Sequence, residues 1–297
     1  MIAPWAESIE KASNGRVKIT LYTAETLVKM QDEYDSLVNG LSDIADIAPG
    51  VTPNRFPLSE IDTLPMLFPS GAVVGRSHNE LLEKYCVNTE LSEVKYLFSI
   101  ALPPMQLLLK KPVQKLEDMN GLKMRIEGKI EGWTMEALGA TGILISTGEM
   151  ATSLERGLID GCALVWEGAL AFGIPQVTKY RTQCDIYTRC FPMIMNKDTW
   201  NQLPPDIQKI FAEQSGPATS MRYGAAADAA MEGGKQAIIG MDKKAGNPDI
   251  DVLSTEERAR WQKVLLPVWD RWVEERKAQP AKEMLDEAIE LIKQYSK

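Results

Sequence analysis

Helical and strand-like segments alternate along the whole chain, and this alternation constrains the fold more than any other feature of the sequence. The early part reads as helix from Trp5 to Ala12, strand from Arg16 to Tyr22, helix from Asp32 to Leu41 and buried strand from Ile44 to Ala48. Apolar residues recur at helical spacing in the first and third segments and alternate with polar ones in the second. This order predicts an α/β fold.

Two places in the sequence indicate that the chain passes between lobes. Pro103-Pro104 follows the long apolar strand 94–102, and a double proline cannot continue a sheet ladder. A second extended run, 183–195, indicates the return. A chain of 297 residues is also long enough for about two lobes. We expect both lobes to be discontinuous, with 1–102 plus 191–230 in lobe I and 103–190 plus 231–297 in lobe II.

The last third of the chain is predicted to be helical. Residues from Pro205 to Lys244 are Ala-rich, with a bend at Gly216-Pro217, and two further helices follow over Thr255 to Ala278 and Ala281 to Tyr295. The first of these two carries four large apolar residues on one face, which indicates a stripe that packs on a core: Trp261, Leu265, Trp269 and Trp272. We expect these C-terminal helices to pack across both lobes.

The composition argues against several classes of protein. The net charge of −8, without a basic run, disfavours nonspecific binding to nucleic acid. No apolar run approaches the roughly 18 residues typical of a membrane-spanning helix. The four cysteines include no C-x-x-C pair and the chain has one histidine, so we expect no metal and no cofactor. Cys184 and Cys190 pairing in an oxidising compartment, or four free buried thiols, are both compatible with the sequence.

Catalytic motifs are missing from the sequence. It contains no G-x-S-x-G elbow, Walker loop or G-x-G-x-x-G phosphate cradle. His78 lies at a helix start, where a polar N-terminal turn is the ordinary explanation. We expect no catalytic residues. The alternative is an enzyme acting on a small acid, with Glu149 or Glu167 as the base.

An arginine inside a short apolar strand is the strongest sign of a functional site. The strand Leu122 to Ile126 follows Asn120-Gly121 and ends before Gly128, with Arg125 near its end. A guanidinium that leaves water needs an anionic partner. We predict that Arg125 holds a ligand carboxylate. The alternative is a solvated arginine on an edge strand.

The segment around this strand resembles the solute-binding proteins of tripartite ATP-independent periplasmic (TRAP) transporters, the DctP-like family. In that family a Gly-Leu-Lys-hydrophobic-Arg strand carries the arginine that grips the substrate carboxylate, and Gly121 to Arg125 match it. A second motif follows in order, matched by Glu149, Leu154, Gly157, Asp160 and Gly161. The likeness extends over most of the chain, including 13–19, 64–68, 176–180 and 195–204.

This resemblance implies a two-lobe fold like that of periplasmic binding proteins, with mixed sheets and a long interlobe helix, whose lobes close on a ligand in the cleft between them. It implies an extracytoplasmic protein that captures an organic acid and delivers it to the membrane permease subunits of a TRAP transporter. We expect a periplasmic monomer. Because Met1 leads directly into a helix, we expect this sequence to contain neither the signal peptide nor the family's first strand.

Two departures from the family pattern narrow the expected ligand. Many relatives carry a second arginine where this chain has Met105. The asparagine that helps relatives hold a carboxylate after the Asp-Gly pair is replaced by apolar residues that include Leu164 and Trp166. Fewer polar partners and more apolar surface predict a monocarboxylate with an apolar or aromatic body. A C4-dicarboxylate or another small acid is the alternative within the family.

The candidate ligand-binding residues are Arg125, Trp166, Met105, Phe191, Glu149 and Leu164. Trp166 and Phe191 have a second interpretation as ordinary core residues. A bound cation near Glu167 is a further alternative, but no cluster of oxygen ligands accompanies that residue in the sequence.

Overall fold

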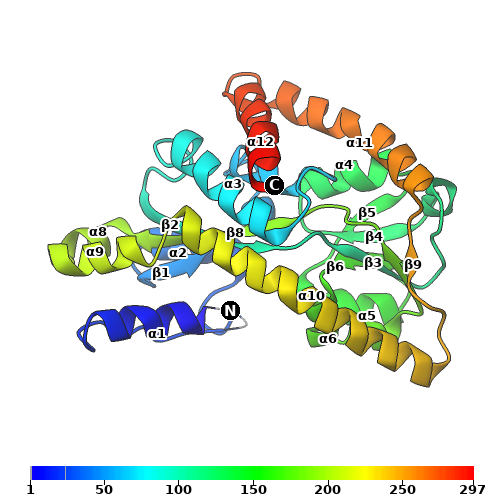
Figure 1. Cartoon of the computed structure of the whole chain (residues 1–297), viewed down its shortest axis with the longest axis horizontal. Coiled ribbons are helices and arrows are strands. Elements are labelled where there is room, and N and C mark those ends of the chain that lie inside the picture. The colour runs from blue at the N-terminus through cyan, green and yellow to red at the C-terminus, as the bar shows by residue number, and fades with distance from the viewer. Residues whose placement is uncertain (1, 24) are drawn as a thin grey trace.

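The structure is a computed structural model that describes residues 2–23 and 25–297, and it has an α/β fold with two separate sheets (Figure 1). The smaller sheet is antiparallel, in the order β1 (Ile44–Asp46), β8 (Arg189–Asn196), β2 (Val94–Leu102). The larger sheet is mixed, in the order β5 (Thr141–Leu144), β4 (Lys123–Ile126), β6 (Gly161–Leu164), β3 (Gln106–Leu109), β7 (Tyr180–Gln183), β9 (Asp251–Val252). The predicted α/β class with mixed sheets is confirmed.

The two connections between the sheets lie side by side. Leu102, the last residue of β2, pairs with Arg189, the first residue of β8. Just beyond them, the Met105 amide donates to the Tyr187 carbonyl oxygen at 2.8 Å, and the Ile186 amide donates to the Met105 carbonyl oxygen at 3.0 Å. The crossings therefore form a hydrogen-bonded pair, close to the positions that the sequence indicates. The assignment of whole segments to each lobe stays a prediction.

Helices cover both sheets. Those beside the smaller sheet are α1 (Ala3–Ala12), α2 (Glu33–Val38), α3 (Gly71–Tyr85), α8 (Lys197–Gln202) and α9 (Pro205–Glu213). Those beside the larger sheet are α4 (Lys129–Ala137), α5 (Met150–Glu155), α6 (Trp166–Ala171) and α7 (Ile174–Val177). Short 3-10 helices are η1 (Met30–Asp32), η2 (Pro49–Val51), η3 (Ser59–Thr63), η4 (Leu116–Met119) and η5 (Thr147–Glu149).

A long helix, α10 (Pro217–Ala245), spans the two sheets as the sequence predicts (Figure 1). It contacts α3 and β2 beside the smaller sheet and α6 beside the larger one. Close approach depends on glycine, because a Cβ on Gly224 would lie 1.9 Å from the carbonyl oxygen of Gly71 in α3. The Asp228 carboxylate then accepts hydrogen bonds from the Gly71 and Ala72 amides at 2.7 and 2.8 Å, which caps α3.

The C-terminal helices α11 (Thr255–Glu275) and α12 (Ala281–Tyr295) follow, within a few residues of their predicted limits. Trp261, Leu265 and Trp272 on α11 are buried, so the predicted stripe packs on a core. The Trp272 indole donates to the Pro57 carbonyl oxygen at 3.2 Å, whereas another part of α11 contacts α4. Helix α11 therefore touches segments beside both sheets.

One predicted strand does not form. Residues 16–22 are extended but pair with no strand among the described residues. Residues 17–22 line a cavity of about 580 Å³ together with residues 41–46, which include the edge strand β1. The alternating pattern predicts a strand, but a strand needs a hydrogen-bonded neighbour and this segment has a cavity beside it.

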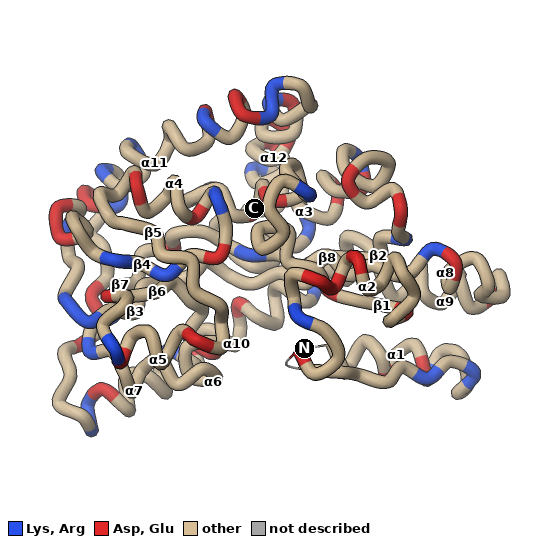
Figure 2. The backbone as a smooth tube through the Cα atoms, turned by 180° about the vertical axis from the view of Figure 1, so that it is seen from behind, with Lys and Arg blue, Asp and Glu red and all other residues tan. Residues whose placement is uncertain are grey.

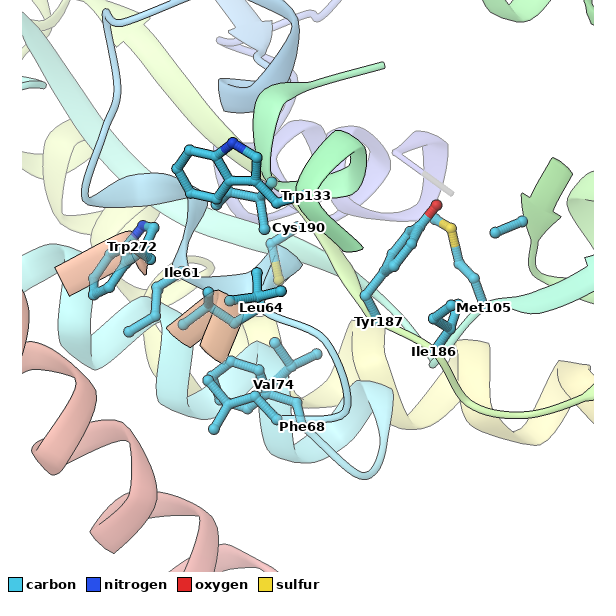
Figure 3. Packing of buried hydrophobic residues seen from close by; sticks show 14 of the residues in the cluster. Ile61, Leu64, Phe68, Val74, Met105, Trp133, Ile186, Tyr187, Cys190 and Trp272 are labelled. Atoms are coloured by element: carbon cyan, nitrogen blue, oxygen red, sulfur yellow. The ribbon is translucent and has the colours of Figure 1, made fainter. Parts of the chain in front are cut away.

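A continuous apolar core runs beneath both crossings. Its buried residues include Leu64 and Phe68 before α3, Trp133 on α4, and Met105 and Tyr187 on the crossings (Figure 3). This one cluster connects segments from both sheets, so the core is packed continuously between them.

Candidate ligand-binding site

Arg125 is buried in the interior of the larger sheet. Its strand, β4, lies between β5 and β6, and its side chain is 5% exposed. The alternative of a solvated arginine on an edge strand is therefore wrong. A charge this deep must be balanced locally, because an unpaired buried guanidinium is costly.

Groups of the chain itself balance Arg125. The Nε atom donates to the Ile145 carbonyl oxygen at 3.0 Å, and Nη2 donates to Thr147 Oγ1 at 2.9 Å and pairs with the Glu127 carboxylate. Nη1 donates to no residue in the described part of the chain. A ligand carboxylate that reaches Arg125 therefore meets a guanidinium whose Nη1 donors are free and whose Nε and Nη2 donors already have partners.

A second buried arginine joins this arrangement. Arg189 at the start of β8 pairs with Glu127 through Nη1 and with Glu131 of α4 through Nη2. We call Arg125, Glu127, Arg189 and Glu131 the arginine–glutamate network. Their side chains are at most 12% exposed, and they connect the end of β4 in the larger sheet to β8 in the smaller one.

Sequence reasoning missed the roles of Glu127, Glu131 and Arg189. A signal was present for the arginine, because Arg189 begins a run of largely apolar residues and Arg125 stands within a short apolar strand. The glutamates gave no comparable signal, since charged residues near a helix start are common on solvated surfaces.

Glu127 is an ionised acceptor in this network. Burial by itself would raise its pKa, but Arg189 and Arg125 outweigh burial, and hydrogen bonds from Thr147 and Arg125 add to their effect. The pKa of Glu127 is lowered as a result. At neutral pH this side chain carries a negative charge and accepts hydrogen bonds without donating any.

A cavity of about 770 Å³ lies beside the network. One wall comes from segments 50–60 near the smaller sheet, the opposite wall from 126–129 and 144–147 near the larger sheet, and the end of α11 contributes 275–276. Arg125 is not among the lining residues, but Glu127, Ile145 and Thr147, which it contacts, are. This size is typical of small-molecule sites.

The basic residues on the cavity wall are also paired. Lys129 contacts Glu275, and Arg276 lies 3.7 Å from Glu60. Burial raises the pKa of Glu60 to about 7, although Arg276 opposes this shift. Figure 2 likewise shows acidic and basic residues interspersed along the backbone. Lys129 and Arg276, the basic residues named on this wall, therefore each already have an acidic partner.

The two walls touch backbone to backbone beside Glu127. A Cβ on Gly128, which follows β4, would lie 2.9 Å from the carbonyl oxygen of Gly50, which follows β1. Gly128 has φ −146°, an extended conformation open to any residue, so its role here is to leave space. The contact requires Gly128 to lack a side chain, whereas a Cβ on Gly50 would come no closer than 4.0 Å to the Cα of Gly128.

Met105 and Leu164 lie near the end of the larger sheet where β4 ends. Gln106 at the start of β3 pairs with Leu164 at the end of β6, and β6 runs parallel to β4. Both candidates are buried, and Tyr187 lies on the crossing beside Met105 (Figure 3). The structure thus brings Arg125, Met105 and Leu164 to one end of the sheet, although Met105 and Leu164 do not line the 770 Å³ cavity.

The remaining candidates lie elsewhere. Trp166 packs in a separate core cluster against α10, where a Cβ on Gly234 would lie 3.0 Å from its Cβ. Phe191 is half-buried on β8 beside a cluster that contains Trp5. Glu149 is exposed and accepts a hydrogen bond from Ser146 at 2.6 Å. None of these three candidates lines the 770 Å³ cavity, and their part in binding stays a prediction.

Asp62, His78 and Cys190 form a buried group that could in principle hold a metal. Both His78 nitrogens are already used, with Ser59 O and Ser99 Oγ each at 2.9 Å, and the Asp62 carboxylate accepts from the Cys190 amide. Burial lowers the pKa of His78. The group therefore has the hydrogen-bonding pattern of a neutral polar core.

Comparison with protein families matches residues 1–276 to DctP, described as bacterial extracellular solute-binding protein, family 7. The chain belongs to this family. The C4-dicarboxylate-binding periplasmic protein DctP of Rhodobacter capsulatus is 28% identical over 286 residues, which cover 92% of this chain and 81% of that protein.

Solved structures of TRAP solute-binding proteins share the fold. One from Rhodoferax ferrireducens, in complex with copurified benzoate, has a TM-score of 0.93 and 27% identity, covering 100% of this chain and 93% of that one. Another, from a marine metagenome, is specific for aromatic acid ligands and holds metahydroxyphenylacetate, with a TM-score of 0.92, 25% identity and coverage of 100% and 94%. The expected two-lobe architecture of a TRAP solute-binding protein is confirmed.

Residues in the described part of the chain form no helix with the length and apolar character of a membrane span.

Family membership gives the contact between Gly50 and Gly128 a functional meaning. The cavity lies between segments beside the smaller sheet and segments beside the larger one, so we infer that Gly128 allows the walls to meet when the lobes close.

We expect Gly128→Val to weaken ligand binding by about 1–3 kcal/mol, because the added side chain overpacks the contact only when the lobes are closed. Calorimetry would give the affinity, and small-angle scattering with saturating ligand would report a less compact protein. Gly148→Ala is the matched control, since a Cβ there meets nothing within 4 Å. An unchanged affinity in Gly128→Val would contradict this role for Gly128.

Proposed function

We propose that this chain captures an organic monocarboxylate with an apolar or aromatic body by lobe closure and delivers it to the membrane permease subunits of a TRAP transporter. The observation that carries the proposal is Arg125, buried in a central strand, with Nη1 free of partners among the described residues and its contacts lining a 770 Å³ cavity.

The surroundings of Arg125 support an apolar ligand body. Met105 and Leu164 stand at the same end of the sheet, and Ile126, Leu144 and Val51 line the cavity. Apolar surface of this kind favours ligands with an apolar body, because binding removes apolar surface of both partners from water. The bound benzoate and metahydroxyphenylacetate of the two solved relatives are acids of this type.

We further propose that the protein works in the periplasm as a monomer, without a catalytic residue or cofactor. Both the family description and the Rhodobacter capsulatus relative refer to an extracellular or periplasmic location. The glutamates named as bases in the enzymatic alternative lie outside the 770 Å³ cavity, with Glu149 exposed on η5 and Glu167 at the start of α6.

A C4-dicarboxylate is the second candidate, because one relative is named for such ligands. A second carboxylate would need another cation. Lys129 and Arg276 line the cavity, but Glu275 and Glu60 already pair with them. We therefore favour the monocarboxylate.

A panel of ligands tests this choice. We expect benzoate or phenylacetate at a hundred times its Kd to stabilise the protein by about 2.7 kcal/mol in thermal unfolding, because the ligand binds only the folded state. Benzamide, which has the same shape without the charge, should give no shift. Stabilisation by succinate alone, or by no acid, would contradict the proposal, and mass spectrometry of an altered acid would favour an enzyme.

A further inference from the structure

We infer that Glu127 accepts a hydrogen bond from a hydroxyl group of the ligand. The site should therefore prefer hydroxylated acids to acids of similar size without a hydrogen-bond donor. This inference deepens the proposed function and rests on it. It follows from the charges and the unused hydrogen-bonding positions of the arginine–glutamate network.

The network is neutral before a ligand arrives. Arg125 and Arg189 carry two positive charges, and Glu127 and Glu131 carry two negative ones. A ligand carboxylate adds a fifth charge to a region where every member is at least 88% buried. Arg125 alone therefore attracts the ligand carboxylate less strongly than an arginine without an acidic partner would. Further hydrogen bonds must contribute to binding.

Two hydrogen-bonding positions at the Arg125–Glu127 pair are unused among the described residues, and the buried Nε of Arg189 is a further donor without a partner there. Arg125 Nη1 has no partner in the described part of the chain. Glu127 Oε1 accepts from Arg125 Nη2 and from Thr147 Oγ1 at 2.8 Å, whereas Oε2 contacts only Arg189 among the described residues. A carboxylate oxygen accepts two hydrogen bonds, so Oε2 keeps one position.

Glu127 also lines the cavity, and we expect its free position to be within reach of a bound molecule. A ligand that offers a carboxylate to Nη1 and a hydroxyl to Oε2 would use both unused positions. An acid without a donor would remove water from Oε2 and replace it with nothing, which is a costly exchange for a buried charged acceptor.

Protonation of Glu127 does not offer another route. Arg189 and Arg125 lower its pKa, so the side chain stays ionised and cannot itself donate to the ligand carboxylate. The donor must come from the ligand.

The test compares hydroxybenzoates with their methyl ethers. Calorimetry with 2-, 3- and 4-hydroxybenzoate and the corresponding methoxybenzoates should show that at least one hydroxylated isomer binds the wild-type protein about tenfold more tightly than its ether. In Glu127→Met, which removes the acceptor, we expect the ratio to fall to within about twofold. Glu127→Gln keeps a weaker, neutral acceptor, so in this variant the ratio should fall to about threefold. This second variant provides the test if Glu127→Met does not fold.

The control is Glu155→Gln, which removes the same charge from an exposed position on α5 and should keep the wild-type ratio. Equal binding of every hydroxylated acid and its ether to the wild-type protein would overturn the role of Glu127 and leave the proposed function standing. A ratio that persists in both Glu127 variants would also overturn it. Binding of no acid at all would reject both ideas.

Discussion

Arg125→Ala is expected to weaken binding of the acid by about 2–5 kcal/mol, because it removes the charged partner of a desolvated carboxylate. The loss should be larger than for a free arginine, since Glu127 would then face the ligand without its neighbour on β4. Calorimetry with the acid identified in the panel gives the affinity directly.

The fold should survive this change. Arg189 still contacts both Glu127 and Glu131, but the buried network then has one arginine for two glutamates, so we expect Arg125→Ala to be folded and less stable than the wild type. Arg125→Lys should recover only part of the affinity, because an ammonium lacks the planar donors of a guanidinium. Lys123→Ala, at an exposed position of the same strand, is the control and should bind as the wild type does. Wild-type affinity in Arg125→Ala would remove this residue from the site.

Gly224→Val is expected to lower the free energy of unfolding by about 3 kcal/mol or more. A Cβ at this position would lie 1.9 Å from the Gly71 carbonyl oxygen and 2.6 Å from the Ala72 amide nitrogen, and backbone atoms cannot move aside as a side chain can. Helices α10 and α3 would separate, and the hydrogen bonds from Gly71 and Ala72 to Asp228 would weaken with them.

Urea unfolding of the ligand-free protein measures this effect. Gly233→Ala, on the same helix, is the matched control, since a Cβ there meets nothing within 4 Å. Its expected effect is a gain of about 0.5–1 kcal/mol, because alanine favours a helix more than glycine does. Similar stabilities for Gly224→Val and the wild type would show that the two helices can separate at little cost.

Local patterns predicted the elements whose formation depends on their own residues. The stripe of Trp261, Leu265 and Trp272 has helical spacing, and α11 formed with that stripe buried. The double proline after β2 predicted a crossing for a similar reason, because it prevents a ladder from continuing. The segment 16–22 shows the limit, since its alternation allows a strand but cannot supply a neighbour.

The site depended on partners that are distant in sequence. The strand pattern singled out Arg125, but Glu127 and Arg189, which lie 62 residues apart, meet only because the end of β4 lies beside the start of β8. Trp166 illustrates a different difficulty. A tryptophan among apolar residues is equally compatible with a ligand platform and with a core, and only tertiary packing distinguishes the two.

The two crossings are joined to each other by the pairing of Leu102 with Arg189 and of Met105 with Tyr187. Helix α10 spans the same gap as a third connection. Two hydrogen-bonded crossings and one spanning helix favour a hinge motion of the two parts over independent displacements. The empty and loaded shapes should therefore differ along a single degree of freedom. One pair of spectroscopic labels, placed across the mouth of the cavity, would then suffice to follow the whole transition.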